Sequence, residues 1–266
     1  MINRLTMKDN LRDFTFLIPL RVDSIVRIEN LLAVINYILK YFDSNIKILQ
    51  ACSYENGLLP KLLNKRVEYI FVEDNDPIFY KTKYQNQLTE LSETSLIGTL
   101  DADIIIPPSQ IIEAVTKLRE GYDIAYPYDG YVYDTNHRIR ELFMRRKNSN
   151  VLLNNQNKMP LMYGTQIKGG AMFVNKDAYI RGGLENEKFY GWGNEDVERY
   201  DRWKILNYKI HCCHGCLFHL SHPRGINSDF HSINQANNAT KELFLTRLSS
   251  KTEMLNCFYN KDIAID

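Results

Sequence analysis

The chain has 266 residues, of which 44% are hydrophobic and 24% charged, and its 33 basic and 32 acidic residues give a formal net charge of +1. This composition is that of an ordinary globular protein and does not indicate disorder. A charge so close to neutral argues against a general nucleic-acid binder, which needs a clear basic excess. No repeat or low-complexity linker interrupts the sequence, so we expect one compact domain with an appended acceptor region.

The sequence also bears on the compartment in which the protein works. It contains no run of roughly 18 to 20 apolar residues, which a transmembrane helix would need, and residues 1–13 lack the apolar middle of a signal peptide. We therefore expect a soluble, cytoplasmic protein, with peripheral association at the inner face of the membrane left open. The odd count of 5 cysteines favours reduced thiols over a disulfide framework.

Strands and helices alternate across residues 14–126. Strands are expected at residues 14–19, 46–52, 67–72, 96–100 and 124–126. Helices are expected from Ser24 to about Tyr41, over about 80–94, and over 110–120 with Ser109 as the N-cap and Gly121 as the stop. This alternation predicts an α/β fold with a mostly parallel, helix-covered sheet. Ligands of such sheets collect at the carboxyl ends of the strands, where Asp101 lies.

The second half of the chain has a different pattern. Residues 127–165 are rich in aromatic, Asn and Arg side chains without steady periodicity, which predicts long loops and short strands that form a lid facing the substrate. Beyond them we expect a strand at 171–174, a helical turn at 176–181, a helix at 194–207 and a strand at 209–220.

Asp101 and Asp103 directly follow the predicted strand 96–100. Because side chains alternate along a strand, two carboxylates at this spacing can face the same side. Hard oxygen ligands suit Mg²⁺ or Mn²⁺ that is also held by substrate phosphates. An acidic turn is the alternative, and the apolar residues on both sides of the segment favour the metal site.

Trp192 stands between Gly191 and Gly193, which allow a sharp turn that presents the indole ring to a sugar. Glu195 and Asp196 follow at the start of a predicted helix. The helix dipole alone favours carboxylates there. An aromatic surface beside two acids is also what a sugar hydroxyl and a general base require, so the segment predicts an acceptor site.

His219 and His222 precede Pro223-Arg224. A lone histidine is more often structural, but two at this spacing favour a metal-ligand role for at least one. Cys213 and Cys216, with nearby histidines, leave a structural zinc site open, although the usual second pair of ligands is missing.

Six segments occur in one order across residues 18–224. They are Ile18-Pro19-Leu20-Arg21, Phe79 to Asn86, Asp101-Ala102-Asp103, Gly169 to Phe173, Gly191 to Asp196, and His219 to Arg224. Together they resemble the beta-1,4-galactosyltransferase family and related bacterial transferases with a GT-A fold, including chondroitin-polymerase-like and polypeptide N-acetylgalactosaminyltransferase-like domains. The chain departs from the family at Leu20, where Phe is usual, and at Lys81, where Arg is usual.

The resemblance implies a GT-A fold, in which a Rossmann-like, mixed and mostly parallel central sheet is flanked by helices. A C-terminal region would bind the acceptor and complete the metal site. Residues 1–266 would then be one domain, with a nucleotide-sugar-binding half at 14–126, an acceptor and catalytic half at 127–225 and a C-terminal extension at 226–266.

The resemblance also implies Mn²⁺ or Mg²⁺ as the cofactor, a UDP-sugar as the donor and a carbohydrate or glycolipid as the acceptor. The metal ligands that it implies are Asp101, Asp103, His219 and His222. The donor-binding residues are Pro19, Arg21, Asp74, Lys81, Lys83, Asp101, Ala102 and Asp103. The acceptor-binding residues are Gly170, Trp192, Gly193 and Glu195, and the catalytic residues are Asp196, as the base, and Glu195.

The expected reaction is transfer of a hexose or N-acetylhexosamine to an acceptor hydroxyl with inversion. Retaining hexosaminyl transfer is the alternative, because relatives that resemble the polypeptide N-acetylgalactosaminyltransferases retain configuration with similar segments. A sugar nucleotidyltransferase would also use acidic metal ligands, but residues 14–24 contain no glycine for its phosphate loop. A non-catalytic carbohydrate-binding or scaffold protein would be expected to lose the acids, and Asp101, Asp103, Glu195 and Asp196 are all present.

Overall fold

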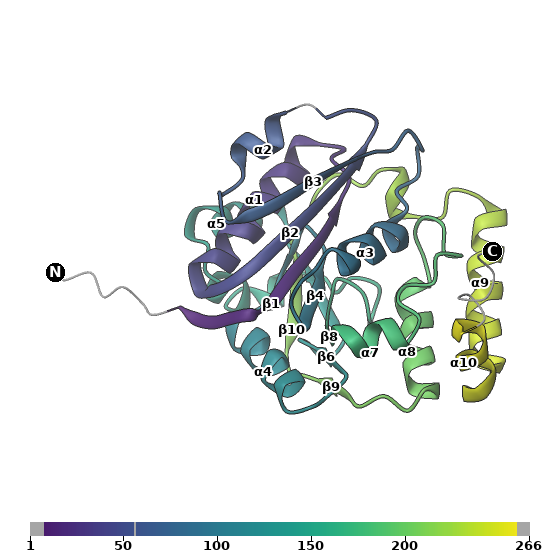
Figure 1. Cartoon of the computed structure of the whole chain (residues 1–266). Coiled ribbons are helices and arrows are strands. Elements are labelled where there is room, and N and C mark those ends of the chain that lie inside the picture. The colour runs from purple at the N-terminus through teal and green to yellow at the C-terminus, as the bar shows by residue number, and fades with distance from the viewer. Residues whose placement is uncertain (1–7, 56, 260–266) are drawn as a thin grey trace.

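The computed structural model describes residues 8–55 and 57–259. In this part of the chain, seven strands form a central sheet in the order β3-β2-β1-β4-β8-β6-β9 (Figure 1). The strands are β1 (Asp9–Leu20), β2 (Phe42–Cys52), β3 (Val67–Glu73), β4 (Leu96–Leu100), β6 (Ile124–Tyr126), β8 (Ala171–Asn175) and β9 (Ile210–Cys212). All neighbours pair in parallel except β8, which is antiparallel to β4 and β6. The predicted α/β fold with a mixed, mostly parallel sheet is confirmed.

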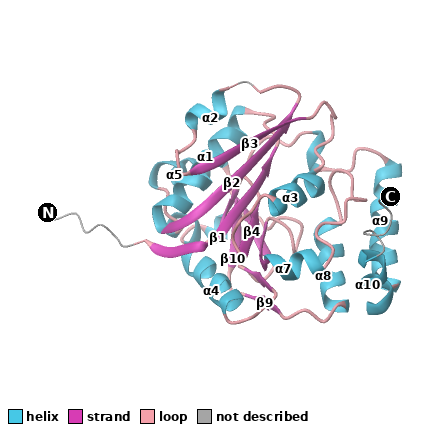
Figure 2. Ribbon diagram, in the orientation of Figure 1, coloured by secondary structure: helices cyan, strands magenta, loops and turns pink. Residues whose placement is uncertain are grey.

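Helices surround this sheet (Figure 2). Residues 14–20 of β1 are all buried, as expected for a strand that is covered on both faces. The α-helices are α1 (Ile25–Tyr41), α2 (Leu58–Leu62), α3 (Lys81–Glu90), α4 (Pro108–Arg119), α5 (His137–Arg146), α6 (Asn150–Leu153), α7 (Lys176–Arg181), α8 (Glu195–Ile205), α9 (Ile233–Leu248) and α10 (Lys251–Tyr259). Two short 3₁₀ helices are η1 (Gln156–Lys158) and η2 (Ile226–Ser228).

The helix ends agree with the sequence in part. The Ser24 side chain caps α1 by accepting from the amide of Arg27, as predicted. Ser109 does not cap α4, because the helix already begins at Pro108, where the missing amide hydrogen costs nothing. Gly121 follows the end of α4 with φ of 91°, which fits its predicted role as a stop.

Two segments differ from their predicted structure. Residues 127–165 contain β7 (Tyr131–Asp134), α5 and α6, so the expectation of loops and short strands was wrong for the two helices. Asn136 caps α5 by accepting from the amide of Ile139 at 3.0 Å, a signal that the scattered aromatic residues obscured. The single strand expected at 209–220 is two strands, because Gly215 turns the chain with φ of 126° between β9 and β10 (Cys216–His219).

A small second sheet positions His219. Its order is β5-β10-β7, where β5 is Ile104–Ile105. The register pairs His219 with Ile104 on one side and with Asp134 on the other. The sheet therefore carries His219 to the turn that follows Asp101.

The C-terminal part packs against α8. Thr246 on α9 donates from its hydroxyl to Glu198 on α8 at 2.8 Å, and both side chains are buried. Figure 1 shows α9 and α10 at the edge of the molecule beyond α8. Across residues 8–55 and 57–259, none of the helices combines the length and apolar character that crossing a membrane demands.

Candidate active site

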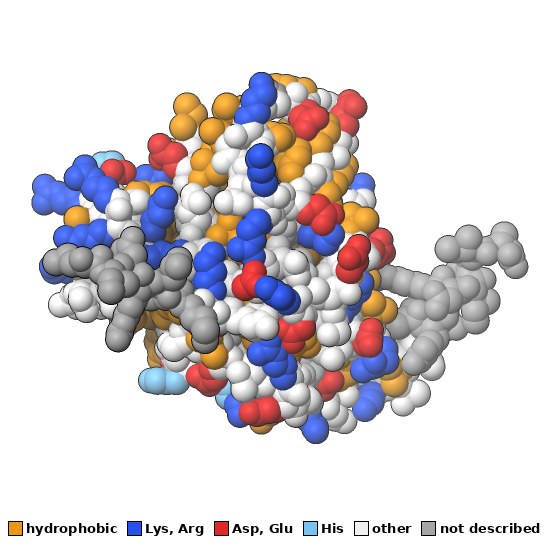
Figure 3. Space-filling view, turned by 60° about the vertical axis from the view of Figure 1, so that its left-hand side comes forward, with side chains coloured by type: hydrophobic (Ala, Val, Ile, Leu, Met, Phe, Trp, Pro, Cys, Tyr) orange, Lys and Arg blue, Asp and Glu red, His pale blue; other side chains and the backbone are white. Residues whose placement is uncertain are grey.

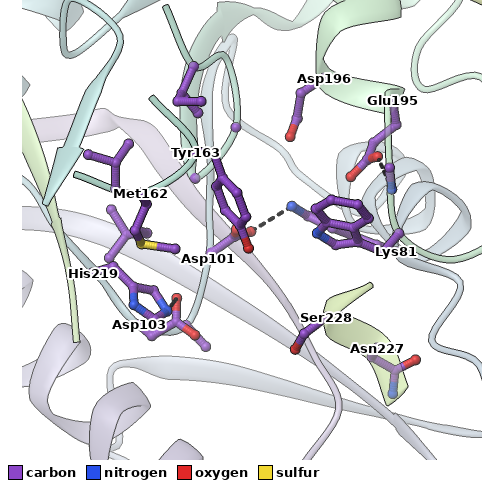
Figure 4. Close-up of a pocket in the computed structure, with 18 of the residues that line it drawn as sticks. Lys81, Asp101, Asp103, Met162, Tyr163, Glu195, Asp196, His219, Asn227 and Ser228 are labelled. Carbon is purple, nitrogen blue, oxygen red and sulfur yellow. Dashed lines mark hydrogen bonds and ion pairs between the residues drawn. The ribbon is translucent and has the colours of Figure 1, made fainter. Parts of the chain in front are cut away.

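A pocket of about 520 Å³ lies where β1 and β4 end. Its walls come from residues 19–27, 79–81, 101–104, 162–170, 191–197 and 219–228, among others. Figure 4 shows Asp103 and His219 at one end, Glu195 and Asp196 at the other, and the pair of Asp101 and Lys81 between them. The three segments singled out in the sequence therefore meet in one cavity.

Asp103, His219 and His222 form a compact group at one end of this pocket, with their ligand atoms all within 4.8 Å of one another. Asp103 Oδ2 lies 3.1 Å from His222 Nε2, and Asp103 Oδ1 lies 3.8 Å from His219 Nε2. One carboxylate and two imidazoles form a donor set that suits a borderline or hard divalent cation.

Both rings are held by their other nitrogen. His219 Nδ1 lies 2.8 Å from Asp134 Oδ1, and His222 Nδ1 lies 2.8 Å from the carbonyl oxygen of Pro223. Metal-binding histidines usually bond a carboxylate or carbonyl in this way, which sets the tautomer and leaves Nε2 for the ion. The residues present thus fit a divalent cation.

Arg27 from α1 also reaches this end of the pocket, with Nη1 3.3 Å from Asp103 Oδ2 and Nε 3.0 Å from Asp23. Burial opposes ionisation of Asp103, but His219, His222 and Arg27 hold the pKa of its carboxyl well below the usual range. Asp103 therefore carries its negative charge at neutral pH.

Asp101 has a different partner. Its Oδ1 lies 2.8 Å from Lys81 Nζ, and it is not part of the group formed by Asp103 and the histidines. The alternation expected for a strand does not continue here, because the chain turns after Asp101 and the amide of Ile104 bonds back to its carbonyl oxygen at 3.2 Å.

The predicted donor residues are brought together in large part. Pro19, Arg21, Lys81 and Ala102 line the pocket with the two aspartates. Asp74 is not in the pocket wall, but it forms an ion pair with Arg21. Arg21 Nε also donates to the carbonyl oxygen of Ala51 at 3.0 Å. Lys83 is not in the pocket wall, and its ammonium lies 5.7 Å from the Tyr84 ring centre.

Trp192 lies among aromatic side chains at the other end. Its ring centre is 6.0 Å from that of Tyr163 and 5.2 Å from that of Phe230. Gly191 and Gly193 have φ of 83° and 115°, so the turn around the tryptophan uses backbone angles that favour glycine, as predicted.

Gln235 from α9 stabilises the turn around Trp192. Its side-chain amide donates to the carbonyl oxygens of Tyr190 and Trp192 at 2.9 and 2.8 Å. The aromatic surface is thus held by a residue from the C-terminal extension, for which the sequence offered no signal.

Asp196 lies at the start of α8 with its two oxygens in different surroundings. Oδ1 is 2.6 Å from Arg199 Nη2, whereas Oδ2 faces Gly169, where a Cβ atom would lie only 2.3 Å away. Arg199 Nη1 is also 2.7 Å from both carboxylate oxygens of Glu185. Burial opposes ionisation, but Arg199 and Lys81 lower the pKa of Asp196.

Glu195, the neighbour of Asp196, has the opposite electrostatics. Burial, followed by the charge of Asp196, raises the pKa of Glu195 to about 7. Glu195 Oε2 accepts from the amide of Gly193 at 2.9 Å, next to the tryptophan. The two adjacent carboxyls therefore titrate differently: Asp196 is ionised at neutral pH, whereas Glu195 is partly protonated.

Four residues of this site were not predicted from the sequence, namely Arg27, Tyr163, Arg199 and Gln235. Arg199 could have been found, because a residue three positions after Asp196 lies on the same face of a helix. The others come from distant segments, and only the fold shows their proximity.

The zinc alternative finds no support at Cys213 and Cys216. Among the described residues, the second group with metal-binding atoms close together is Glu113, His211 and Cys213, without Cys216. Cys213 is buried, and its thiol points to the carbonyl oxygen of Gln110 at 3.6 Å. In the part of the chain that the structure describes, the cysteine pair of the zinc alternative therefore does not form a metal-binding group.

Part of the chain matches the model of a known protein family. A family model described as the N-terminal domain of galactosyltransferase matches residues 151–223, a stretch that includes Trp192, Asp196, His219 and His222. No curated protein matches the sequence. The resemblance to galactosyltransferases that the motifs indicated is confirmed over this stretch.

Solved structures match over most of the chain. The catalytic domain of Drosophila beta1,4-galactosyltransferase 7, in complex with xylobiose, has 12% identity and a TM-score of 0.55, with 86% of this chain and 79% of that chain covered. Glucosyl-3-phosphoglycerate synthase from Mycobacterium tuberculosis, with Mn²⁺, UDP and phosphoglyceric acid, has 14% identity and a TM-score of 0.51, with 89% of this chain and 78% of that chain covered. GalNAc-T7 with UDP, GalNAc and Mn²⁺ has 10% identity and a TM-score of 0.57, with 86% and 47% covered. The chain thus has the fold of GT-A glycosyltransferases, as predicted.

Proposed function

We propose that this chain is a metal-dependent glycosyltransferase that moves a hexose or N-acetylhexosamine from a UDP-sugar to a hydroxyl of a glycan or glycolipid. The observation that carries the proposal is the pairing, in one pocket, of a metal-binding group at one end with an ionised carboxylate beside an aromatic surface at the other. The Mn²⁺ and UDP in two of the similar structures support it.

Asp103, His219 and His222 would hold the cation, which we propose to be Mn²⁺ or Mg²⁺. When bound, the cation supplies Lewis-acid stabilisation to the departing nucleotide diphosphate. Asp101 contributes indirectly, by keeping the Lys81 ammonium at the centre of the pocket. Lys81 is held in its charged form because Asp101, Asp196 and Glu195 raise its pKa against the effect of burial.

The donor would bind along the carboxyl end of β1. Arg21 is pre-positioned by Asp74 and the carbonyl oxygen of Ala51, so it can contact the nucleotide without losing much side-chain freedom. Pro19 and Ala102 form the wall beside it. The proposed donor-binding half is residues 14–126, but Lys83 does not line this pocket.

The acceptor would stack on Trp192, with Tyr163 beside it, because sugar faces pack on aromatic rings. Gly170 and Gly193 line the pocket there, and Glu195 offers a carboxyl to a sugar hydroxyl. The acceptor and catalytic half is residues 127–225, and the extension at 226–266 supplies Gln235 to hold the turn at Trp192.

Asp196 is the proposed base. It removes the proton from the acceptor hydroxyl as that oxygen bonds to the anomeric carbon and the bond to the diphosphate breaks, which inverts configuration. Its Oδ2, which faces Gly169 in the pocket wall, would take the proton, while Oδ1 stays with Arg199. Retaining hexosaminyl transfer is the second candidate, supported by the similarity to GalNAc-T7.

A panel of nucleotide sugars, incubated with the protein and Mn²⁺ and assayed for release of the nucleoside diphosphate, tests the function. The proposal expects release from at least one UDP-sugar and none from sugars on other nucleotides. Proton NMR of the first product then distinguishes inversion from retention, and a retained anomer would exclude Asp196 as the base of a direct displacement.

A further inference from the structure

Positive charge gathers on the outer surface of α5. The α5 basic surface comprises Lys40, Arg138, Arg145, Arg146 and Lys147. Arg138, Arg145 and Arg146 are all exposed, and spacings of seven and eight residues place them on one face of the helix. The ammonium of Lys40 on α1 donates to the carbonyl oxygen of Lys147 at 2.9 Å, which joins the end of α1 to this face. Figure 3 shows Lys and Arg side chains crowded at one edge of the molecule.

This charge is local and is not neutralised. Residues 137–158 contain six basic residues and one acidic residue, whereas the whole chain has a net charge of +1, so the rest of the chain is negative. The single acid, Glu141, pairs with Arg140, which is buried and also pairs with Glu29. Within residues 8–55 and 57–259, no carboxylate pairs with the three arginines of the exposed face.

An apolar side chain protrudes among these cations. Leu142 is 42% exposed and lies four residues after Arg138 and three before Arg145, on the same face. The opposite face of α5 is anchored by Ile139 and Phe143, which are buried in the core. A basic helix face with a projecting leucine is typical of helices that lie on a membrane surface.

The helix is tied to both sides of the pocket wall. Before α5, Val132 on β7 lines the pocket, and after α6 the chain returns to pair Leu161 with Tyr133. Met162 and Tyr163 follow immediately and line the pocket again. The segments on either side of α5 and α6 therefore both contribute to the wall of the pocket.

We propose that the α5 basic surface binds the anionic headgroups of a phospholipid bilayer. Each Lys or Arg near such a surface contributes a favourable attraction, and these contributions add. The projecting leucine favours a bilayer over a soluble polyanion, which offers no apolar interior. The consequence for the enzyme, access to acceptors held at the membrane, rests on the proposed function, whereas the binding itself does not.

Co-sedimentation with vesicles tests the proposal. Vesicles of phosphatidylcholine alone are compared with vesicles that contain about one third phosphatidylglycerol, at an ionic strength of about 0.1 M. The protein should bind only the anionic vesicles, and added salt should release it. Replacement of Arg138, Arg145 and Arg146 by Gln should weaken binding about 100-fold.

The control replaces the same number of exposed cations elsewhere, Arg181, Lys204 and Lys241, by Gln. These lie on α7, α8 and α9, away from α5 in Figure 1, and should leave vesicle binding unchanged. Thermal unfolding of both variants confirms that they remain folded.

Three results would overturn the proposal: no binding to anionic vesicles, equal loss in the control, or full binding by the α5 variant. Leu142→Ser should weaken vesicle binding while it leaves binding to heparin, a soluble polyanion, unchanged. If the protein binds heparin but not anionic vesicles, the α5 basic surface binds soluble polyanions and the proposal is wrong. Vesicle binding requires no donor, so its failure is distinct from a failure of glycosyl transfer.

Discussion

Asp196 and Arg199 lie one turn apart on α8, with Asp196 Oδ1 2.6 Å from Arg199 Nη2. The same guanidinium holds both oxygens of Glu185 at 2.7 Å and is itself buried. Arg199 therefore keeps Asp196 ionised and fixes one of its oxygens, which leaves the other for the acceptor. This arrangement supports the proposal that Asp196, and not Glu195, takes up the acceptor proton.

Asp196→Asn should lower kcat by about 10² to 10⁴-fold, the usual contribution of general-base catalysis. The amide has nearly the shape of the carboxylate but cannot take up the acceptor proton. Binding of UDP, measured by calorimetry with Mn²⁺, should stay within a factor of a few of the unaltered protein. Undiminished turnover in this variant would remove Asp196 from the mechanism.

The pH at which catalytic activity is lost should depend on the charge of Arg199. The double variant Glu185→Gln, Arg199→Met removes the guanidinium without leaving Glu185 charged and unpaired. Since a nearby opposite charge lowers a carboxyl pKa by about 1 to 3 units, the acidic limb of kcat/KM should move up by about that amount. As the pH falls, the base of the double variant would become protonated, and activity would be lost, at a higher pH than in the unaltered protein. Glu185→Gln alone is the control, and an unmoved limb in the double variant would contradict the role of Arg199.

Asp134 should support the metal through His219. Asp134→Asn keeps a side chain of similar size but weakens the acceptor that orients His219 Nδ1, now at 2.8 Å. Loss of such a partner typically costs 10 to 100-fold in metal affinity. Calorimetric titration with Mn²⁺, without donor, measures the effect directly. Asp129→Asn, which alters a comparable pair with His214 outside the pocket, should leave the affinity unchanged.

The free energy of unfolding should depend on pH because the pKa of Glu195 is raised in the folded protein. Because the folded protein raises this pKa to about 7, the ionised form is disfavoured on folding, and stability is lost as pH rises through about 7. Glu195→Gln abolishes that penalty, so the variant should gain on the order of 3 kcal/mol over the unaltered protein between pH 5 and pH 8. Denaturant unfolding at several pH values measures the free energy of unfolding of both proteins. The same dependence of this free energy on pH in both would refute the expectation.

Much of the fold follows from the sequence because its signals are local. The buried strands that end at Leu20 and Leu100 consist mostly of apolar residues, and Ser24 caps its helix through a side chain three residues from its partner amide. The glycines around Trp192 indicated a turn, which their positive φ values confirm. Each of these features is decided within a few residues.

The rest depends on contacts between distant segments. The orientation of His219 by Asp134 needs the register between β10 and β7, across 85 residues. Asp101 was predicted to bind the metal, but it lies outside the group formed by Asp103, His219 and His222. The chain turns after Asp101, and Lys81 from α3 pairs with it. Arg27 was not expected at the pocket, since nothing in its own helix indicates the 3.3 Å approach to Asp103. Tertiary geometry, and not local preference, sets these positions.

The most direct test of the central claim is the release of UDP from a UDP-sugar with acceptor present, with and without Mn²⁺, for the unaltered protein and for Asp103→Ala. Asp103 is the carboxylate that lies 3.1 Å from His222 and is buried at one end of the pocket. We predict Mn²⁺-dependent release by the unaltered protein and none by Asp103→Ala at the same metal concentration. Equal release without metal, or by the variant, would contradict a cation held by this group.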